Sequence, residues 1–350
     1  MPESALHAHL AARGAVHADD RGVALPRHFG DPAAEYAALV HGAALVDLGH
    51  RTLVVASGAD RTSFLQGMLT NDVARLAPGQ GCPALLLTIQ GRVTADLRVA
   101  VRSDAILLDV DVRAKDDLVQ ALEALIIADD VTLDGPAEPT ALVALDGPRA
   151  AALLPEAARA LSPFAHAEAA IAGVAVRVVR ASEVKGPGVV LHVPAAQAPV
   201  LWDGLVAAGA RPCGMEALEG RRVEVGVPRI GVDMGSRTLS LELPVAEAVS
   251  DTKGCYLGQE VVARGTARGQ VNRSLVPLLL DGPAPEAGAP LMRAGKEVGH
   301  LTTVARAFGM EGRLVALAMV RREHQDPGIE LAVRAGRAVT IARVASWPLA

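Results

Sequence analysis

Cys255 is the residue of this chain whose neighbours are best suited to chemistry. Gly258, Gln259 and an acidic residue follow it, an order typical of the first turn of a helix. A helix N-terminus and a nearby cation both favour thiolate over thiol, and Lys253 lies two residues before the cysteine. We therefore predict a reactive thiol at this position. The commoner alternative for a lone cysteine is a buried and inert one.

The other two cysteines carry no such prediction. Cys82 precedes a proline, Cys213 follows one, and neither has an evident activating neighbour. The three cysteines lie far apart and form no CxxC pair, so we expect no disulfide framework and a reducing compartment. The ten histidines show no HxxxH or HExxH pattern, so we expect no metal site.

Two carboxylates are the next candidates. Residues 93–101 alternate, so that apolar side chains share one face of a strand while Asp96 and Arg98 share the other. A solvated charge or an ion pair with Arg98 is the ordinary fate of such an aspartate. Glu224 lies near the end of a predicted helix, where an exposed charge is the ordinary interpretation.

The elements that must position these residues follow an α+β pattern. Residues 52–133 give the order strand, helix, three strands, helix, strand. A Gly/Pro-rich link at 134–136 leads to a second cycle with a similar rhythm. We predict two ferredoxin-like α+β units. In and around the second cycle we expect helices at 4–12, 32–42, 148–161, 195–209 and 214–225, and strands at 141–145, 174–180 and 189–193.

The residue composition of the chain changes after Pro244. Short segments rich in Val, Leu and Thr alternate there with Gly/Pro turns, which predicts a small antiparallel β-barrel. Its expected strands lie at 274–280, 296–305, 314–320 and 338–344.

Composition bounds the remaining possibilities. A chain of 350 residues predicts two or three domains, and with 51% hydrophobic but 2% aromatic residues the core must consist of Ala, Val and Leu. A net charge of −5 gives no indication of nucleic-acid binding. The chain has no uncharged apolar stretch of about 18 residues and no signal-peptide pattern, so we expect a cytoplasmic protein without a membrane partner. We expect it to be a monomer.

Residues 253–260, with the sequence KGCYLGQE, resemble the signature of YgfZ-type folate-binding proteins, relatives of the glycine-cleavage aminomethyltransferase (T-protein). Segments 45–51, 64–73, 220–228 and 299–303 are also similar to that family. The resemblance implies a three-domain cloverleaf around a central cavity that binds tetrahydrofolate. Its first domain would be discontinuous (1–50 and 136–243), its second would span 51–135, and the barrel domain (244–350) would carry the signature at its start.

The same resemblance implies site residues. Glu224 matches the pterin-binding glutamate of the T-protein's Arg-Leu-Glu-Ala-Gly run, in which Arg222 is the arginine, and Asp96 matches the second aspartate of its Gly-Gly-x-x-Asp-Asp-Leu segment. We assign folate binding to these residues and to two others in matching segments, and catalysis to two residues of the signature. The two further folate contacts are Asn71 and Tyr256, and the catalytic pair is Cys255 and Lys253.

Two departures from the T-protein pattern guide the functional interpretation. Ala95 replaces the first aspartate, and Cys255 stands where the T-protein usually has Asp. Aminomethyl transfer needs a carboxylate to organise proton movement. These departures speak against transferase chemistry, and the resemblance to YgfZ-type proteins implies instead a tetrahydrofolate-binding accessory protein in iron–sulfur cluster assembly or repair, with iron–sulfur enzymes or assembly factors as partners. The alternatives are a folate-dependent aminomethyltransferase or demethylase, and a scaffold in which Cys255 is dispensable.

Overall fold

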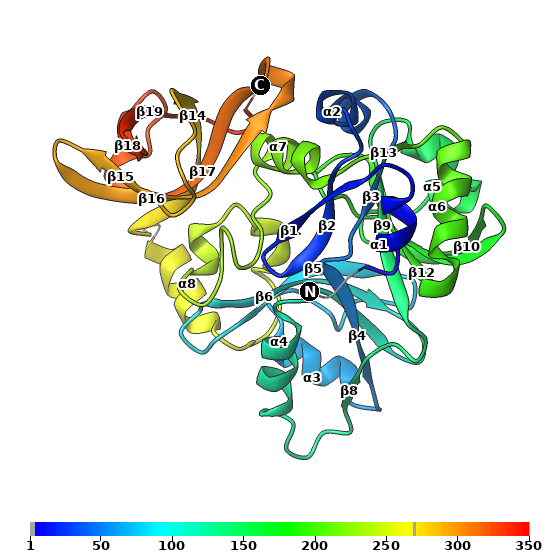
Figure 1. The fold of residues 1–350 in the computed structure, drawn as a ribbon. Helices are drawn as coiled ribbons and strands as arrows, with labels where there is room; N and C mark the ends of the chain where they lie inside the picture. Colours follow the sequence, from blue (N-terminus) through cyan, green and yellow to red (C-terminus); the bar gives the residue numbers. More distant parts are fainter. Residues whose placement is uncertain (1–3, 269–270, 350) are drawn as a thin grey trace.

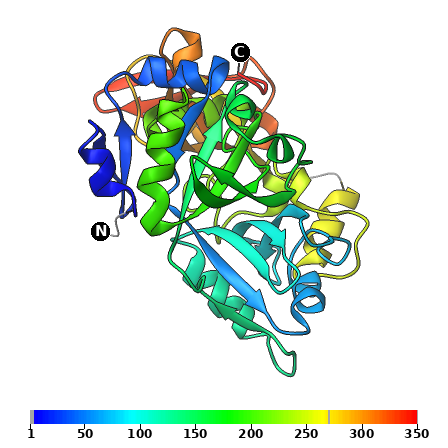
Figure 2. The same ribbon diagram turned by 90° about the vertical axis from the view of Figure 1, so that its right-hand side faces the viewer.

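The computed structural model describes residues 4–268 and 271–349, which form three sheet-based units (Figures 1 and 2). In Figure 1 the C-terminal barrel lies at the upper left, the first α+β unit at the right and the second at the bottom. Helix α7 (Met215–Val225) lies between the barrel and the first unit and packs against both. The predicted fold class, two α+β units and a small antiparallel barrel, is confirmed.

The first unit is built on a six-stranded sheet in the order β10-β11-β12-β9-β3-β13. Its strands are β3 (Ala44–Asp47), β9 (Thr140–Asp146), β10 (His166–Ile171), β11 (Val174–Val179), β12 (Gly188–Pro194) and β13 (Arg211–Pro212). Strand β3 pairs with β9, so the N-terminal segment and the chain beyond residue 140 share one sheet. Also in this part of the chain are the hairpin β1 (Val16–Asp20) and β2 (Val23–His28), and the helices α1 (His7–Ala11), α2 (Pro32–His41) and α6 (Ala198–Ala207).

Local chemistry explains where helix α2 begins and why no long helix forms at 148–161. Helix α2 starts where the Asp31 side chain accepts a hydrogen bond from the backbone N–H of Ala34, with Pro32 in the first turn. The predicted helix at 148–161 is wrong. A 3-10 turn (Ala150–Leu153) and a four-residue helix α5 (Glu156–Arg159) stand in its place. Pro155 separates them because it has no N–H to donate and forces Leu154 out of helical geometry.

The second unit is an antiparallel sheet in the order β5-β6-β7-β4-β8. Its strands are β4 (Arg51–Ser57), β5 (Gly81–Leu87), β6 (Val93–Val101), β7 (Ile106–Asp111) and β8 (Thr132–Asp134), with helices α3 (Arg61–Met68) and α4 (Lys115–Glu123). The predicted alternation in β6 is confirmed. Ala95 and Leu97 belong to the apolar core, while Asp96 and Arg98 are only partly buried on the opposite face.

The barrel is closed in the order β14-β17-β16-β15-β18-β19. Its strands are β14 (Arg273–Asp281), β15 (Pro290–Arg293), β16 (Lys296–Ala307), β17 (Arg313–Arg321), β18 (Glu330–Ala335) and β19 (Ala338–Val344). Strands β15 and β18 had no counterpart among the predicted segments.

The predicted start of the barrel domain at residue 244 needs correction. The chain between the α+β units and the barrel contains 3-10 turns (Ser240–Glu242 and Ala246–Ala248) and helix α8 (Gln259–Arg268). In this stretch Ala248, Tyr256 and Val262 join the apolar core of the second unit. The KGCYLGQE signature therefore packs on the second unit, because its apolar side chains complete that core, and barrel pairing begins only at β14. Helix α8 begins directly after the signature glycine, as predicted.

No helix in the described residues is both long and apolar enough to cross a membrane.

Candidate functional site

A small cavity of about 50 Å³ lies between the first two units. Loop and strand residues of both units line one side, and helix α7 with the segment that follows it lines the other. The lining consists of His50, Arg51, Asp96, Arg98, Asp111, Glu183, Met215, Leu218, Arg222, Val227, Pro228, Arg229 and Ile230. Two predicted folate residues, Asp96 and Arg222, are therefore brought together here although they are far apart in sequence.

Asp96 is the carboxylate of this cavity with a free acceptor. Its Oδ1 is buried and accepts no hydrogen bond from any described residue, and its Oδ2 lies 3.8 Å from Nη1 of Arg51. The side chain keeps 29% of its surface accessible. Burial raises the pKa of Asp96, while Arg51 and Arg98 act in the opposite direction. A carboxyl with a raised pKa and an unused oxygen is suited to bind a ligand N–H and to exchange a proton.

Arg51 is fixed by the neighbouring strand β7. Its Nε donates to Oδ1 of Asp109 at 2.6 Å, and Nη1 of Arg98 donates to the other carboxylate oxygen at 3.1 Å. Burial alone would raise the pKa of Asp109, but the two arginines outweigh burial and lower it. Arg98 also donates to Glu183 at 2.5 Å, which ties the second unit to the first. This buried ion-pair chain fixes the floor beneath Asp96.

His50 contributes a second unused polar atom. The side chain is 4% exposed, and its Nδ1 has no hydrogen-bond partner in the part of the chain that the structure describes. Burial, assisted by Arg229 and Arg51, lowers the pKa of His50 well below its usual value. The imidazole is therefore neutral at physiological pH and can donate or accept one hydrogen bond at the cavity.

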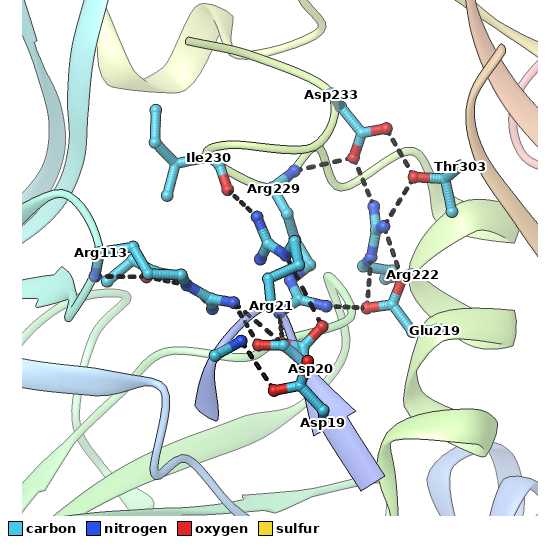
Figure 3. Close-up of polar contacts among 12 residues, drawn as sticks. Asp19, Asp20, Arg21, Arg113, Glu219, Arg222, Arg229, Ile230, Asp233 and Thr303 are labelled. Carbon is cyan, nitrogen blue, oxygen red and sulfur yellow. Dashed lines mark hydrogen bonds and ion pairs between the residues drawn. The ribbon is translucent and has the colours of Figure 1, made fainter. Parts of the chain in front are cut away.

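Arg222 joins helix α7 to the barrel (Figure 3). Its Nη1 donates to Oδ2 of Asp233 at 2.8 Å, and its Nη2 donates to Oγ1 of Thr303 at 3.0 Å. The same guanidinium bonds Glu219 through Nε and Nη2, at 2.8 and 2.6 Å. Burial would raise the pKa of Glu219, but Arg222 and Arg229 outweigh it and lower the pKa to about 2. Arg222 thus holds α7, the following loop and the barrel together at the cavity wall.

Glu224 is not brought to this cavity. It is 1% exposed, and its Oε2 accepts hydrogen bonds from the Tyr36 hydroxyl at 2.5 Å and from Nη1 of Arg221 at 3.1 Å. Residues two apart point to nearly opposite sides of a helix, so Glu224 faces α2 while Arg222 faces the cavity. Its Oε1 is buried without a hydrogen-bond partner among the described residues. A pterin contact at Glu224 stays a prediction.

Lys253 is placed as an anchor of the signature segment. The side chain is buried, and its ammonium donates to the carbonyl oxygens of Gln66, Leu69 and Asn71 at 2.6, 2.5 and 3.0 Å. These carbonyls lie at and just beyond the C-terminal end of α3, where unpaired carbonyls favour a cation. Burial lowers the pKa of Lys253 to about 8.

The remaining predicted residues also lie around this segment. Cys255 is exposed, whereas Cys82 and Cys213 are buried. Tyr256 is buried in the apolar core, and the Lys253 ammonium lies 5.2 Å from the centre of its ring. The Asn71 amide donates to the backbone carbonyls of Pro83 and Glu247, at 2.7 and 3.0 Å. Among the described residues, the lining of the cavity includes none of Asn71, Lys253, Cys255 and Tyr256.

Ala95 does not weaken the case for this cavity. Its side chain is fully buried in the core of the second unit, on the opposite face of β6 from Asp96. A carboxylate at position 95 would point into apolar surroundings in this fold. The interpretation of Ala95 as a missing catalytic group is therefore not supported by its position.

Several cavity residues could not be identified from the sequence. His50 and Arg51 lie in a segment that had been matched to a family, but no role was assigned to them. Arg229 and Glu183 had no local signal that would have distinguished them from surface charges. The described residues contain no group of three or more His, Cys, Asp or Glu side chains that could hold a metal ion.

Comparison with known proteins identifies relatives over nearly the whole chain. Residues 6–253 match the GCVT N-terminal domain, and residues 273–349 match the glycine cleavage T-protein C-terminal barrel domain. The chain is similar to the "Aminomethyltransferase" of Thermus thermophilus (30% identity, 96% of this chain and 95% of the relative). It is also similar to that of Halalkalibacterium halodurans (29% identity, 94% and 93%).

A solved structure shows the same fold. The crystal structure of glycine cleavage system aminomethyltransferase T from Bartonella henselae superimposes with a TM-score of 0.89 at 21% identity, over 100% of this chain and 98% of that chain. The curated relatives are named aminomethyltransferases and match most of this chain, so they contradict the predicted role in iron–sulfur cluster assembly. The relatives favour the alternative, a folate-dependent aminomethyltransferase. The predicted partners stay a prediction.

Proposed function

The chain belongs to the GCVT N-terminal domain family and carries the T-protein C-terminal barrel, and on this premise we propose that it is a tetrahydrofolate-dependent aminomethyltransferase. The names of the curated relatives support this activity. The structural observation that carries the proposal is the buried Oδ1 of Asp96 at the cavity between the first two units, which accepts no hydrogen bond from the described residues.

The chemistry of the cavity fits tetrahydrofolate. A pterin presents N–H donors that pair well with a carboxylate, and Asp96 has an oxygen free to accept them. The neutral His50 adds a hydrogen-bonding atom that is also unused within the described chain. The volume, about 50 Å³, is well below the roughly 300 Å³ at which ligand pockets begin. Binding of a ligand of that size therefore requires the cavity to widen.

Each cavity residue has a distinct task in this proposal. Tetrahydrofolate supplies the nitrogen atoms that accept the one-carbon unit. Asp96 binds the ligand and exchanges a proton with it, and its raised pKa makes it a stronger base than an ordinary aspartate. Arg51, held by Asp109, keeps the Asp96 carboxylate in place and limits the rise of its pKa. The surrounding ion pairs keep these groups from reorienting.

Within the family, the KGCYLGQE string supports grouping this chain with the YgfZ-type folate-binding members. That grouping concerns ancestry and folate binding. Catalysis by Cys255 stays a prediction, and the reactivity of its thiol can be tested separately from folate binding.

The proposal is tested by supplying the protein with an aminomethylated lipoyl carrier protein and tetrahydrofolate and following the formation of methylene-tetrahydrofolate. Asp96→Asn should lower turnover by roughly 10²- to 10⁴-fold, because it removes a general acid–base group. Asp104→Asn is the matched control, since Asp104 is exposed and pairs only with Arg102 among the contacts described. A wild-type protein without turnover would overturn the proposal, and full turnover in Asp96→Asn would remove Asp96 from the mechanism.

A further inference from the structure

Three arginines converge at the tip of the β1–β2 hairpin, beside the cavity (Figure 3). Asp20 lies between them. Its Oδ2 accepts from Nη2 of Arg229 at 2.6 Å and from Nη1 of Arg113 at 3.2 Å, and its Oδ1 lies 3.7 Å from Nε of Arg21. Arg113 comes from the second unit and Arg229 from the segment after α7, so the hairpin tip closes over the junction of separate elements.

Two of these guanidinium groups are well paired. Arg113 bonds both carboxylate oxygens of Asp111, at 2.6 and 2.7 Å. Arg229 bonds Glu219 at 2.6 Å in addition to Asp20. These bidentate and bridging contacts leave little capacity in either group for a further anion.

Arg21 differs from them because most of its donors are unused. Its Nη1 donates to the backbone carbonyl of Ile230 at 3.0 Å. Its Nε and Nη2 are buried and make no hydrogen bond to any residue that the structure describes. A buried N–H group without an acceptor has a free-energy cost. A ligand that supplies an acceptor at this point would remove that cost.

The backbone conformation of Arg21 and the charges around it also favour a bound anion. Arg21 has a φ of 53°, in the left-handed region that glycine or asparagine adopts more readily, and Gly22 follows it in the hairpin turn. Burial, followed by Arg229 and Arg113, lowers the pKa of the Arg21 guanidinium. Asp20 and Asp111 act in the opposite direction, and a bound anion would add to their stabilisation of the charged guanidinium.

We infer that Arg21 binds a carboxylate of the ligand at the rim of the cavity, through Nε and Nη2, which make no hydrogen bond within the described residues. The inference rests on the proposed function, because tetrahydrofolate ends in a glutamate whose carboxylates provide this chemistry. Ile230 and Arg229 line the cavity and also contact Arg21 and Asp20, so the hairpin tip and the cavity share a wall. A guanidinium edge and a carboxylate pair in a parallel, two-bond arrangement.

The test compares tetrahydrofolate with tetrahydropteroate, which has the same pterin but no glutamate, by calorimetric titration. Arg21→Gln and Arg21→Gly should each weaken tetrahydrofolate binding by about 10- to 100-fold, the loss expected for a charge-assisted pair. Both should leave tetrahydropteroate affinity within about twofold. The glycine variant keeps the positive φ of the turn and so separates loss of the guanidinium from loss of the hairpin. Arg27→Gln is the matched control, since Arg27 lies on the same hairpin but is exposed and bonds Glu216.

The other possible outcomes distinguish failure of the Arg21 assignment from failure of the proposed function. Equal weakening of both ligands, or of neither, would overturn the assignment of Arg21. Equal affinity of the wild-type protein for both ligands would show that the glutamate is not recognised, while the proposed function would stand. Failure of the wild-type protein to bind either ligand would overturn the proposed function and this inference with it.

Discussion

The central cavity and the signature segment (residues 253–260) are built in opposite ways. The cavity collects charged side chains from strands, loops and a helix that lie far apart in sequence, and it leaves an oxygen of Asp96 and a nitrogen of His50 unused within the described chain. The signature is contiguous, and its lysine and its tyrosine serve to hold the segment in place. Lys253 binds three backbone carbonyls and Tyr256 fills the core, while Cys255 is exposed.

The signature segment therefore identifies the family, whereas the cavity has the groups that are suited to chemistry. A contiguous string is easily recognised even when it serves to fasten one segment to another. Unused hydrogen-bonding capacity inside a protein, by contrast, has a free-energy cost that is hard to explain without a ligand. The cavity has such capacity and the buried part of the signature does not. The four predictions below test this contrast, from the largest expected effect to the smallest.

The first prediction compares a buried ion pair at the cavity with an exposed ion pair of the last signature residue, within helix α8. Arg222→Met should lower the free energy of unfolding by about 3–5 kcal/mol, because it leaves the buried Asp233 carboxylate without its ion-pair partner and removes one of the two arginines that pair with Glu219. Arg264→Met, in helix α8, should cost about 0.5 kcal/mol or less, since its pair with Glu260 is exposed and 3.9 Å long. Urea unfolding measures both. Similar losses in the two variants would contradict the contrast.

The second prediction tests Lys253 as an anchor. Lys253→Met keeps the length of the side chain but leaves three carbonyls unpaired, so we expect a loss of about 2–3 kcal/mol at neutral pH. The pKa of Lys253 is lowered to about 8 from 10.5, so the unfolded chain holds its proton more tightly than the folded chain between these values. Wild-type stability should therefore rise with pH across this window relative to the variant, by roughly 1–3 kcal/mol. A constant difference between pH 7 and 10.5 would contradict this.

The third prediction distinguishes a pterin-binding role of Glu224 from a purely structural one. If Glu224 binds the pterin, Glu224→Gln should weaken tetrahydrofolate binding about tenfold or more. Its observed hydrogen bonds to Tyr36 and Arg221 predict instead a loss of stability of about 1–2 kcal/mol and an affinity within about twofold. We expect the second result, measured by calorimetry and thermal unfolding. Tyr36→Phe is the control, because it removes the partner of Glu224 without changing its charge.

The smallest effect is expected at Cys255. Under limiting iodoacetamide Cys255 should be alkylated first, since it is exposed, whereas burial raises the pKa of Cys82 to about 12 and also raises that of Cys213. Cys255→Ser should change stability by no more than about 0.5 kcal/mol and leave tetrahydrofolate affinity unchanged. Peptide mapping and titration provide the readouts. A large loss of aminomethyl transfer in this variant would restore the predicted catalytic role of the thiol.

Much of the fold could be predicted because local patterns decide it. The alternation in β6 placed Asp96 opposite Ala95, and Gly/Pro punctuation with short apolar runs indicated the barrel. Prediction failed where a single residue outweighed the average pattern, as at Pro155, and where strands are short, as in β15. The boundary near residue 244 failed because the apolar residues that follow it complete the core of a unit that lies earlier in the chain.

The sequence by itself determined the periodicities, the turns and the family, because these depend on neighbours along the chain. Only the tertiary structure decided which charged groups meet. Arg51 and Asp109 are separated by 58 residues, and Arg229 and Asp20 by 209, yet both pairs are in hydrogen-bond contact at the cavity. The helical repeat of α7 directs Arg222 and Glu224 to opposite sides, and only the packing of that helix shows which side is the cavity. Function depends on these long-range encounters, since burial and unused hydrogen-bonding atoms are properties of the folded chain alone.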